Sequence, residues 1–326
     1  MRHCQLQTCF RSTAIIGSGI AAALILHFLP ANVSAEDRFQ ASVSEMMKGT
    51  GGAAVASDPR TGRILAIWNR QVIFERRFPP GSTAKLVTGA VALENHLIAS
   101  DEKLYCRRVP RLLGEAYRCS HAEALEPFTL ATALANSCNY YFCELSTRMD
   151  AATLTRGYVQ FGLGGGSGGH ARLRIPSEPK AKARAGLGEM PVNVTPAELL
   201  MAYSAVAMQG SMYELHEKRV HPARAQRTIR LSSSTWQTLA QGFEECVRSG
   251  TCQGAAVPGV RVAGKTGTAS ALDESGWTHA WFAGYAPAES PQVAIVVLLN
   301  RGTGTHDAAP LAGRILRQYF AAKGGP

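Results

Sequence analysis

Residues 78–85 read Phe-Pro-Pro-Gly-Ser-Thr-Ala-Lys, and an apolar run from Leu86 to Leu93 follows directly. Two prolines and a glycine before the serine favour a helix start, and the apolar run predicts a buried helix behind it. Ser82 and Lys85 are three positions apart, which is nearly one helical turn, so both would lie on one face. A serine becomes a nucleophile when a base takes its proton, and a partly neutral lysine can be that base.

The Ser-x-x-Lys pattern alone does not identify a site, because it occurs three times in the chain. Ser100 to Lys103 lies in a polar stretch that is typical of a solvated loop. The run from Ser177 to Lys180 contains a proline, which opposes a helix that would link the pair. Only Ser82 has helix-start residues before it and an apolar run behind it. An ordinary helix N-terminus without catalytic function would have the same two features.

A second cluster, Ser137-Cys138-Asn139, follows an Ala-rich helical stretch at residues 130–135 and precedes a predicted helix from Tyr140 onward. A hydroxyl and an amide at this junction could relay the proton of Lys85 and hold a substrate amide. A helix-capping serine would give the same pattern, so the cluster needs support from elsewhere in the chain.

A third cluster, Lys265-Thr266-Gly267-Thr268, follows a strand-like run at residues 260–263. A glycine at 267 allows another backbone to approach closely. The lysine charge and the two flanking hydroxyls suit a ligand that carries a carboxylate. An ordinary glycine turn after a strand is the structural alternative.

Strand signals occur at both ends of the chain. Residues 52–57 and 64–68 form a predicted hairpin, while residues 260–263, 277–285 and 293–300 predict an antiparallel meander. Helices are expected between them, including 196–208 with Thr195 as N-cap, and a closing helix at 314–322; residues 162–190 read as a long surface loop. The predicted fold is therefore α+β, an α/β sandwich whose antiparallel sheet combines N- and C-terminal strands and carries helices on both faces.

The first 35 residues are typical of an export signal. Arg2 and Arg11 form a basic start, residues 14–29 are apolar, and small residues lead up to Ala35. We expect a signal peptide over residues 1–35 and one domain over 36–326, with an uncleaved N-terminal anchor as the alternative. The net charge of +10, or +8 without Arg2 and Arg11, favours anionic surroundings such as cell-wall polymers or membrane surfaces, and general solubility is an equal explanation of it. No run of arginines and aromatics indicates nucleic acid.

Six cysteines follow residue 35, and in an exported protein they can pair. Cys106 with Cys119, and Cys246 with Cys252, bracket short loop-like segments and are candidate disulfides. Cys138 and Cys143 would lie about 8 Å apart on one helix, too far to be bridged. Cys106, Cys119 and His121 are candidate zinc ligands, but no C-x-x-C spacing supports them, so we expect no metal and no cofactor.

The three clusters, in this order, resemble the three motifs of penicillin-binding protein transpeptidase domains. The resemblance covers roughly residues 50–320 and includes the first hairpin, the helix after Thr195 and the run 279–287. It implies a β-lactamase/transpeptidase-like fold. The chain departs from larger members, because little room remains for the additional regions that they carry. Cys246 and Cys252 flank the segment that resembles the approach to the active-site strand, and our hypothesis is a local disulfide there. Residues 279–287 resemble the strand next to the active-site strand. They contain His279 and Trp281, which we expect to serve in packing and not in catalysis.

The resemblance also implies roles for the site residues. Ser82 would be the acylated nucleophile and Lys85 its base, although the identity of the base is disputed within this superfamily. Ser137 would pass the proton to the leaving amine, and Asn139 would bind the donor peptide. Lys265 would set the electrostatic field, Thr266 and Thr268 would hold the terminal carboxylate, and Gly267 stands between them in the substrate-binding strand. The backbone N–H groups of Ser82 and Thr268 would form the oxyanion hole.

The function implied is a serine D,D-transpeptidase that cross-links peptidoglycan stem peptides and binds β-lactams covalently, with cell-wall synthesis proteins as further candidate partners. A D,D-carboxypeptidase would differ only in its acceptor. A serine β-lactamase would need rapid deacylation, but the class A run Glu-x-x-Leu-Asn is absent, and Asn139 stands where class D enzymes have valine. A non-catalytic β-lactam sensor is a third alternative, which an uncleaved N-terminal anchor would favour.

Overall fold

The computed structural model describes residues 34–122, 126–165, 172–217, 225, 227–271 and 276–324. The expected signal sequence, apart from Ser34 and Ala35, lies outside this part of the chain, as do the glycines at 166, 168 and 169. In the described part, every helix is too short or too polar to cross a lipid bilayer.

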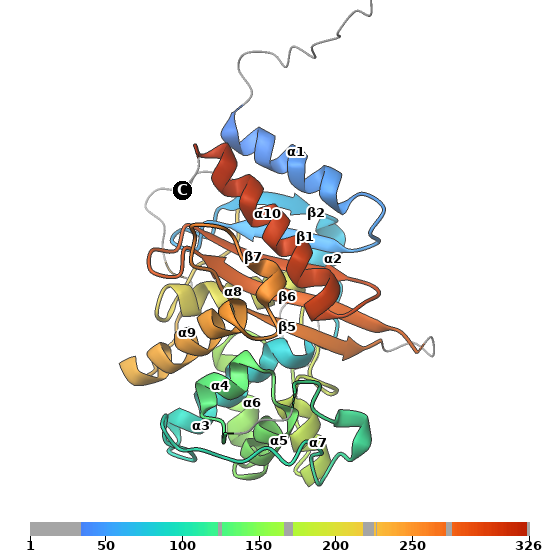
Figure 1. Cartoon of the computed structure of the whole chain (residues 1–326), viewed down its shortest axis with the longest axis vertical. Coiled ribbons are helices and arrows are strands. Elements are labelled where there is room, and N and C mark those ends of the chain that lie inside the picture. Colours follow the sequence, from blue (N-terminus) through green and yellow to red (C-terminus); the bar gives the residue numbers. More distant parts are fainter. Residues whose placement is uncertain are drawn as a thin grey trace, which may run out of the picture. The chain divides into compact units, whose positions relative to one another are not determined.

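A five-stranded antiparallel sheet combines both ends of the described chain (Figure 1). Its strand order is β2-β1-β7-β6-β5, so the N-terminal hairpin adds to the edge of a C-terminal meander. The strands are β1 (Ala53–Ser57), β2 (Ile64–Trp68), β5 (Ala263–Ser270), β6 (Thr278–Ala286) and β7 (Val293–Leu299). Every residue of the central strand β7 is buried, because helices cover both faces of the sheet there.

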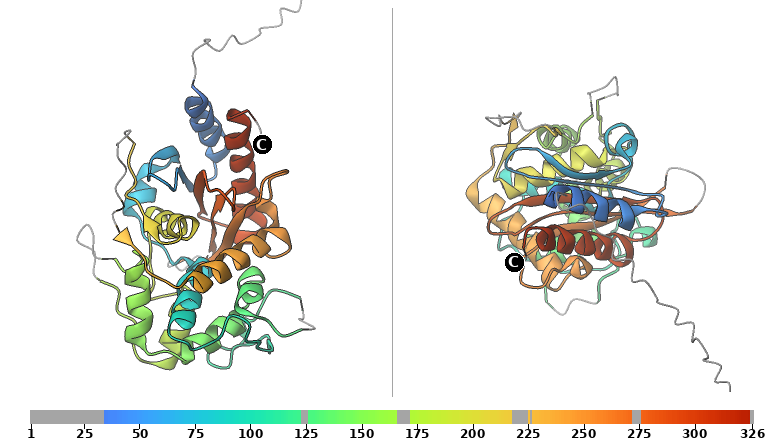
Figure 2. Two further views of the ribbon diagram at one scale, coloured as in Figure 1. Left: turned by 90° about the vertical axis from the view of Figure 1, so that its left-hand side faces the viewer. Right: turned by 90° about the horizontal axis from the view of Figure 1, so that it is seen from above.

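Alternate residues of the strands pack against two different helical layers. On one face, Ala54, Phe282 and Ile295 pack in a cluster with the helices α1 (Ala35–Met47) and α10 (Ala309–Ala322). On the other face, Val55, Trp281 and Val296 belong to the larger core, which includes the helix α8 (Pro196–Ala207). Figure 2 shows α1 and α10 side by side on the outer face of the sheet. This two-sided sandwich confirms the predicted α+β fold.

Most of the remaining helices form a helical region beside β5, at the end of the sheet away from the first hairpin (Figure 1). They are α3 (Lys85–Glu94), α4 (Leu130–Ala135), α5 (Asn139–Thr147), α6 (Ala151–Gln160), α7 (Pro179–Gly186) and α9 (Ser233–Arg248). Helix α2 (Arg70–Glu75) lies instead against β1 and α8, beside the first hairpin. The short elements are η1 (Gly81–Ala84), η2 (Glu115–Tyr117), η3 (Gln253–Ala255), η4 (Gly304–Ala308), β3 (Ser211–Met212) and β4 (Arg227–Thr228). Helix α3 runs through the middle of this region and is buried over most of its length, as its apolar sequence predicts.

Local sequence signals located several elements accurately. Helix α4 has the predicted bounds, and Thr195 caps α8 through a capping box in which its side chain accepts a hydrogen bond from the Glu198 N–H. The loop predicted over residues 162–190 is wrong in part, because Pro179 opens α7, whose Ala183 and Ala185 are buried. The strand predicted at 260–263 is also misplaced, because β5 begins at Ala263 and contains the whole Lys265–Thr268 cluster.

Candidate active site

Ser82 lies in the one-turn helix η1 that leads into α3. Gly81 precedes it with a φ of +53°, a conformation that glycine adopts readily. The Gly81 N–H donates to the carbonyl oxygen of Gly188 at 2.9 Å, which fixes this turn against the loop after α7. Ser82 remains partly exposed, whereas Lys85, the first residue of α3, is fully buried. The sharp start of the buried helix therefore presents Ser82 at its end and keeps Lys85 inside.

The Lys85 ammonium group is held by the second cluster. Its Nζ donates to the Ser137 carbonyl oxygen at 2.8 Å and to the Asn139 Oδ1 at 2.7 Å, and it lies 3.2 Å from the Ser137 hydroxyl. Burial lowers the pKa of Lys85 to about 8, while the nearby sulfurs of Cys138 and Cys119 act in the opposite direction. A lysine of this kind is partly neutral near pH 7 to 8, so it can exchange a proton with a neighbouring hydroxyl.

Ser137 occupies a strained position between α4 and α5. Its φ is +54°, which is uncommon for a residue with a side chain. The turn is held because the Cys138 N–H donates to the Ala133 carbonyl at 2.9 Å and Cys138 caps α5. Asn139 follows as the first residue of α5, and its Nδ2 donates to the Tyr117 carbonyl at 3.1 Å. The turn thus directs both polar side chains of the second cluster toward Lys85 and its surroundings.

The third cluster lies in β5, at the edge of the sheet that faces η1. Lys265 is buried and its Nζ donates to the Thr266 carbonyl at 3.1 Å. Burial, together with the charge of Lys85, lowers the pKa of Lys265 well below its usual range. Two buried lysines therefore lie close enough to influence each other, from elements far apart in the sequence.

Gly267 lets β5 approach the segment before Ser82. A Cβ atom at this position would lie 2.6 Å from the Pro80 carbonyl oxygen, closer than side chains tolerate, and in tight contact with the Trp281 Cβ at 3.2 Å. On the neighbouring strand, the Trp281 Nε1 donates to the Pro79 carbonyl at 3.0 Å. The expected packing role of Trp281 therefore includes a direct hydrogen bond to the approach of Ser82.

One hollow, with a volume of about 280 Å³, collects a residue from each of the three clusters, namely Ser82, Asn139 and Thr268. Tyr117, Leu187 and Glu189 also line it. Burial raises the pKa of Glu189 to about 7, against the opposing effects of a hydrogen bond from the Ser270 backbone and of Arg184. The hollow therefore combines a hydroxyl, an amide and a titratable carboxyl group.

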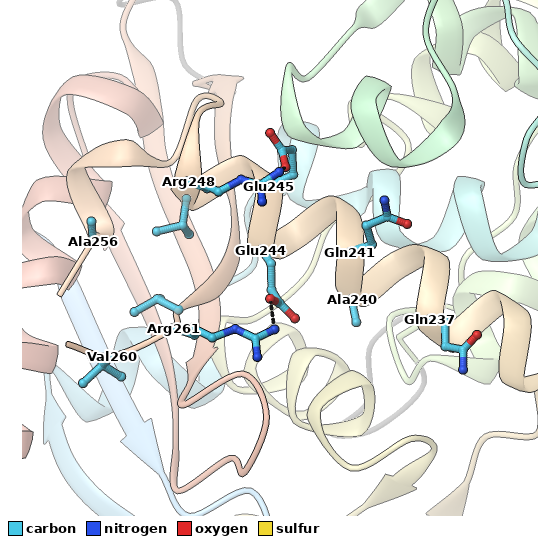
Figure 3. Close-up of a pocket in the computed structure, with 11 residues that line it drawn as sticks. Gln237, Ala240, Gln241, Glu244, Glu245, Arg248, Ala256, Val260 and Arg261 are labelled. Carbon is cyan, nitrogen blue, oxygen red and sulfur yellow. Dashed lines mark hydrogen bonds and ion pairs between the residues drawn. The ribbon is translucent and has the colours of Figure 1, made fainter. Parts of the chain in front are cut away.

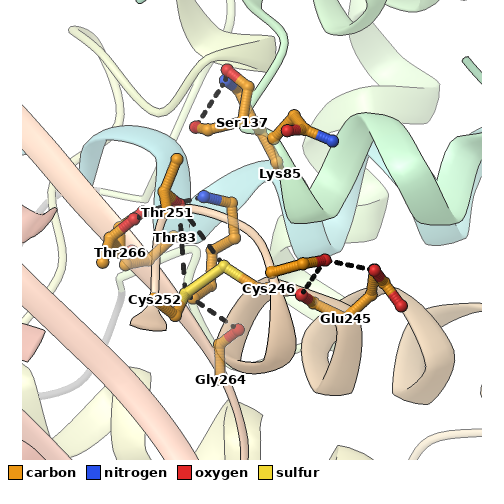
Figure 4. The surroundings of a disulfide bond; sticks show 12 residues. Thr83, Lys85, Ser137, Glu245, Cys246, Thr251, Cys252, Gly264 and Thr266 are labelled. Carbon is orange, nitrogen blue, oxygen red and sulfur yellow. Dashed lines mark hydrogen bonds between the residues drawn. A yellow bond between two sulfur atoms is a disulfide. The ribbon is translucent and has the colours of Figure 1, made fainter. Parts of the chain in front are cut away.

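The two threonines of the third cluster face different surroundings. Thr268 lines the hollow, and its Oγ1 accepts a hydrogen bond from the Gly304 N–H at 3.0 Å. The Oγ1 of Thr266 instead lies 2.7 Å from the Oγ1 of Thr251, in the loop closed by a disulfide between Cys246 and Cys252 (Figure 4). The disulfide therefore braces a loop that contacts β5.

The other predicted pairing differs from the structure. Cys106 and Cys119 are both free, because their sulfurs lie 3.6 Å apart, well beyond the S–S bond length of about 2.05 Å. Cys138 and His121 lie in the same group of side chains. Cys143 is a separate buried thiol in α5 and does not pair with Cys138, as expected.

A larger hollow of about 870 Å³ lies elsewhere, along α9 (Figure 3). It is lined by residues such as Gln237, Gln241 and Glu244, and Glu244 forms an ion pair with Arg261 there. None of the three clusters contributes to it. Size alone would therefore select the wrong place for the chemistry.

Residues 52–320 match the family model described as the penicillin-binding protein transpeptidase domain. The chain belongs to this family. The match covers every strand of the main sheet and all three clusters, which agrees with the resemblance of the motifs.

Relatives of this transpeptidase-family chain include the peptidoglycan D,D-transpeptidase MrdA of Acinetobacter baumannii, 25% identical over 87% of this chain and 53% of that protein. The stage V sporulation protein D of Bacillus subtilis is 27% identical over 84% of this chain and 50% of that protein. The chain thus spans about half the length of these relatives. A crystal structure of a peptidoglycan glycosyltransferase from Burkholderia ambifaria superposes with a TM-score of 0.74 and 25% identity, covering 90% of this chain and 95% of that one.

Three residues at the site were missed by the sequence analysis. Glu189 and Tyr117 line the hollow, and Thr251 bonds to Thr266. Glu189 directly follows the Gly-Leu-Gly run at 186–188. Such a run predicts a tight turn, and this turn could have marked Glu189 as a candidate site residue. Tyr117 and Thr251 lie in irregular segments, for which sequence patterns give no direction.

Proposed function

We propose that this chain is a serine D,D-transpeptidase that cross-links peptidoglycan stem peptides. The observation that carries the proposal is the hollow in which Ser82, Asn139 and Thr268 meet, with Lys85 bound to the second cluster behind it. A nucleophile, a buried base and a carboxylate-binding strand are the parts that acyl transfer from a peptide requires. The relatives named as D,D-transpeptidases support the same activity.

In the acylation step, the Ser82 Oγ attacks the carbonyl carbon of the penultimate D-alanine, and Lys85 takes the hydroxyl proton. The C–N bond to the terminal D-alanine then breaks, and Ser137 passes the proton to the departing nitrogen. The contact of 3.2 Å between Lys85 Nζ and the Ser137 hydroxyl provides the connection for this relay. The backbone N–H groups of Ser82 and Thr268 would stabilise the oxyanion.

Substrate binding is assigned to the strand and the turn that face the hollow. Thr268 would bind the terminal carboxylate, with the charge of Lys265 behind it, and Asn139 would hold the peptide amide. Thr266 would support β5 through its bond to Thr251, since its hydroxyl is already engaged there. Gly267 would keep the strand within reach of Ser82.

In the second step, an amine of a neighbouring stem peptide attacks the acyl carbon and releases Ser82. Water in place of the amine would give a D,D-carboxypeptidase, which uses the same residues. A β-lactam would acylate Ser82 and remain attached, because the chain lacks the deacylation signature of class A β-lactamases. We further propose that the chain acts outside the cytoplasm, alongside other cell-wall synthesis proteins.

Labelling with a fluorescent penicillin tests the proposal. The wild type should carry a persistent adduct, Ser82→Ala should carry none, and the matched control Ser100→Ala, in the exposed second Ser-x-x-Lys run, should label normally. Equal labelling of wild type and Ser82→Ala would reject Ser82 as the nucleophile. Rapid, repeated turnover of a chromogenic cephalosporin would favour the β-lactamase alternative instead.

A further inference from the structure

A compact group of side chains lies beside the candidate site and takes no part in the proposed chemistry. The sulfurs of Cys106, Cys119 and Cys138 and a ring nitrogen of His121 all lie within 4.8 Å of one another. Cys119 and Cys138 are buried, while Cys106 and His121 are partly exposed. Three of these residues come from the segment between α3 and α4, and Cys138 comes from the N-terminus of α5. We call them the Cys3His cluster.

The distances within the Cys3His cluster match the edges of a metal-centred tetrahedron. Zinc–sulfur bonds of about 2.3 Å and zinc–nitrogen bonds of about 2.0 Å give edges of about 3.8 Å between sulfurs and about 3.6 Å between sulfur and nitrogen. The sulfurs of Cys106 and Cys119 are 3.6 Å apart, and those of Cys119 and Cys138 are 3.8 Å apart. The Cys106 sulfur lies 3.6 Å from the His121 Nε2. Each of these three distances agrees with its edge to within about 0.2 Å.

The surroundings of the cluster fit deprotonated ligands. A backbone N–H donates to each sulfur: Arg108 to Cys106 at 3.2 Å, Tyr140 to Cys119 at 3.3 Å, and Tyr141 to Cys138 at 3.4 Å. The last two N–H groups belong to the N-terminus of α5, where negative charge is favoured.

His121 is oriented in the same way. Its Nδ1 lies 2.7 Å from the Ala122 carbonyl oxygen, so Nδ1 carries the proton and Nε2 is left for a metal. This is the usual second contact of a metal-binding histidine, because it fixes both the tautomer and the direction of the ring.

We propose that Cys106, Cys119, His121 and Cys138 bind a structural zinc ion. Thiolates with one imidazole form a common closed zinc site, and hard cations such as Mg²⁺ prefer oxygen ligands instead. The absence of a C-x-x-C spacing led the sequence analysis to expect no metal. The fold removes that objection, because it brings Cys138 from a different element to complete the set of four ligands.

The zinc ion would position the second cluster. Cys138 stands between Ser137 and Asn139, and both of these residues contact the Lys85 Nζ. The segment that supplies the other three ligands also contains Tyr117, whose carbonyl accepts from the Asn139 amide. The ion would therefore link the segment between α3 and α4 to the Ser137–Asn139 turn. The consequence for catalysis rests on the proposed function, whereas the binding of zinc does not.

Metal content of the full-length chain, purified without chelator, tests the proposal. We expect roughly one zinc ion per chain in the wild type, and a loss of about tenfold or more in Cys119→Ala and His121→Asn. Cys143→Ala is the matched control, since Cys143 is a buried cysteine of α5 outside the cluster, and it should keep its zinc. Replacement of the zinc by Co²⁺ should give the visible absorption of a tetrahedral thiolate site in the wild type and in Cys143→Ala.

A second measurement separates metal binding from folding. A chelator should lower the Tm of the wild type and of Cys143→Ala, but not that of His121→Asn, whose partly exposed side chain can be replaced without opening the core. Ser82→Ala should hold zinc as the wild type does, so failure of the proposed function would leave this result intact. Zinc below about a tenth of an ion per wild-type chain, even after incubation with Zn²⁺ and a reductant, would overturn the proposal. So would a metal-free chain with a Cys106–Cys119 disulfide.

Discussion

The Lys85 ammonium nitrogen lies 2.8 Å from the Ser137 carbonyl oxygen and 3.2 Å from the Ser137 hydroxyl. The two residues are 52 positions apart, and a left-handed turn at Ser137 presents both oxygens to the same amine. The carbonyl contact requires only the backbone, whereas the hydroxyl contact requires the side chain. Substitutions at Ser137 can therefore separate the position of Lys85 from the transfer of its proton.

Ser137→Ala should slow acylation by penicillin by about 100-fold or more, because it removes the hydroxyl that relays the proton. Lys85 would keep its bonds to the backbone and to Asn139, so the fold should persist. Ser137→Gly removes the same hydroxyl but tolerates the φ of +54°. It should label as slowly as Ser137→Ala, with a Tm about 2–4 °C higher. Wild-type labelling rates in both variants would exclude the relay.

The rate of acylation should rise with pH through the titration of Lys85. A base must be neutral to accept a proton, and burial lowers the pKa of Lys85 to about 8. Below that pH, the neutral fraction and the second-order rate constant should fall roughly tenfold per pH unit. Stopped-flow measurement of the acylation rate between pH 5.5 and 9 tests this dependence. The Glu189→Gln variant gives the cleanest result, because it lacks the carboxyl group that titrates near pH 7. A rate independent of pH below 8 would assign the base to another group.

Much of the fold was predictable because its signals are local. The capping residue Thr195 and the apolar run after Lys85 each indicate a helix, and the C-terminal runs rich in valine, isoleucine and aromatic residues indicate strands. Strand β5 was misplaced because its glycines and lysine conceal a strand whose stability comes from its neighbours, β6 and η1. Helix α7 was missed because its lysine-rich, glycine-containing sequence has the composition of a loop.

The motif residues of the site were predictable, but the contacts that support them were not. Ser82, Asn139 and Thr268 could be named from sequence order, although only folding brings them to one hollow. The meeting of Cys138 with Cys106 and His121 depends on the path of an irregular segment that no periodicity describes. The same holds for the bond between Thr251 and Thr266, which depends on how the disulfide loop meets β5.

Glu189→Gln should raise the acylation rate above neutral pH and leave it unchanged below. Burial raises the pKa of Glu189 to about 7, so this group gains a negative charge as the pH rises through neutrality. The charge lies in the hollow that would take the carboxylate of penicillin, and repulsion of about 1 kcal/mol would weaken acylation roughly fivefold. The wild-type rate should therefore rise less steeply than that of Glu189→Gln between pH 6 and 8, so that the two rates agree at pH 5.5 and differ roughly fivefold at pH 9. Glu45→Gln, an exposed change on α1, is the control and should behave as the wild type. Equal rates in Glu189→Gln and the wild type at pH 9 would contradict this assignment.

Gly267→Ala should separate β5 from the turn that carries Ser82. The added methyl group would lie 2.6 Å from the Pro80 carbonyl oxygen, which is backbone and cannot move aside alone. We expect a loss of about 1–3 kcal/mol in the free energy of unfolding and acylation slowed roughly 10- to 100-fold. Gly89→Ala is the matched control, because its methyl group would meet only side-chain atoms, of Leu130 at 3.3 Å and of Leu239 at 3.7 Å, inside a helix that favours alanine. If Gly267→Ala acylates as fast as Gly89→Ala, the close approach of β5 does not position Ser82.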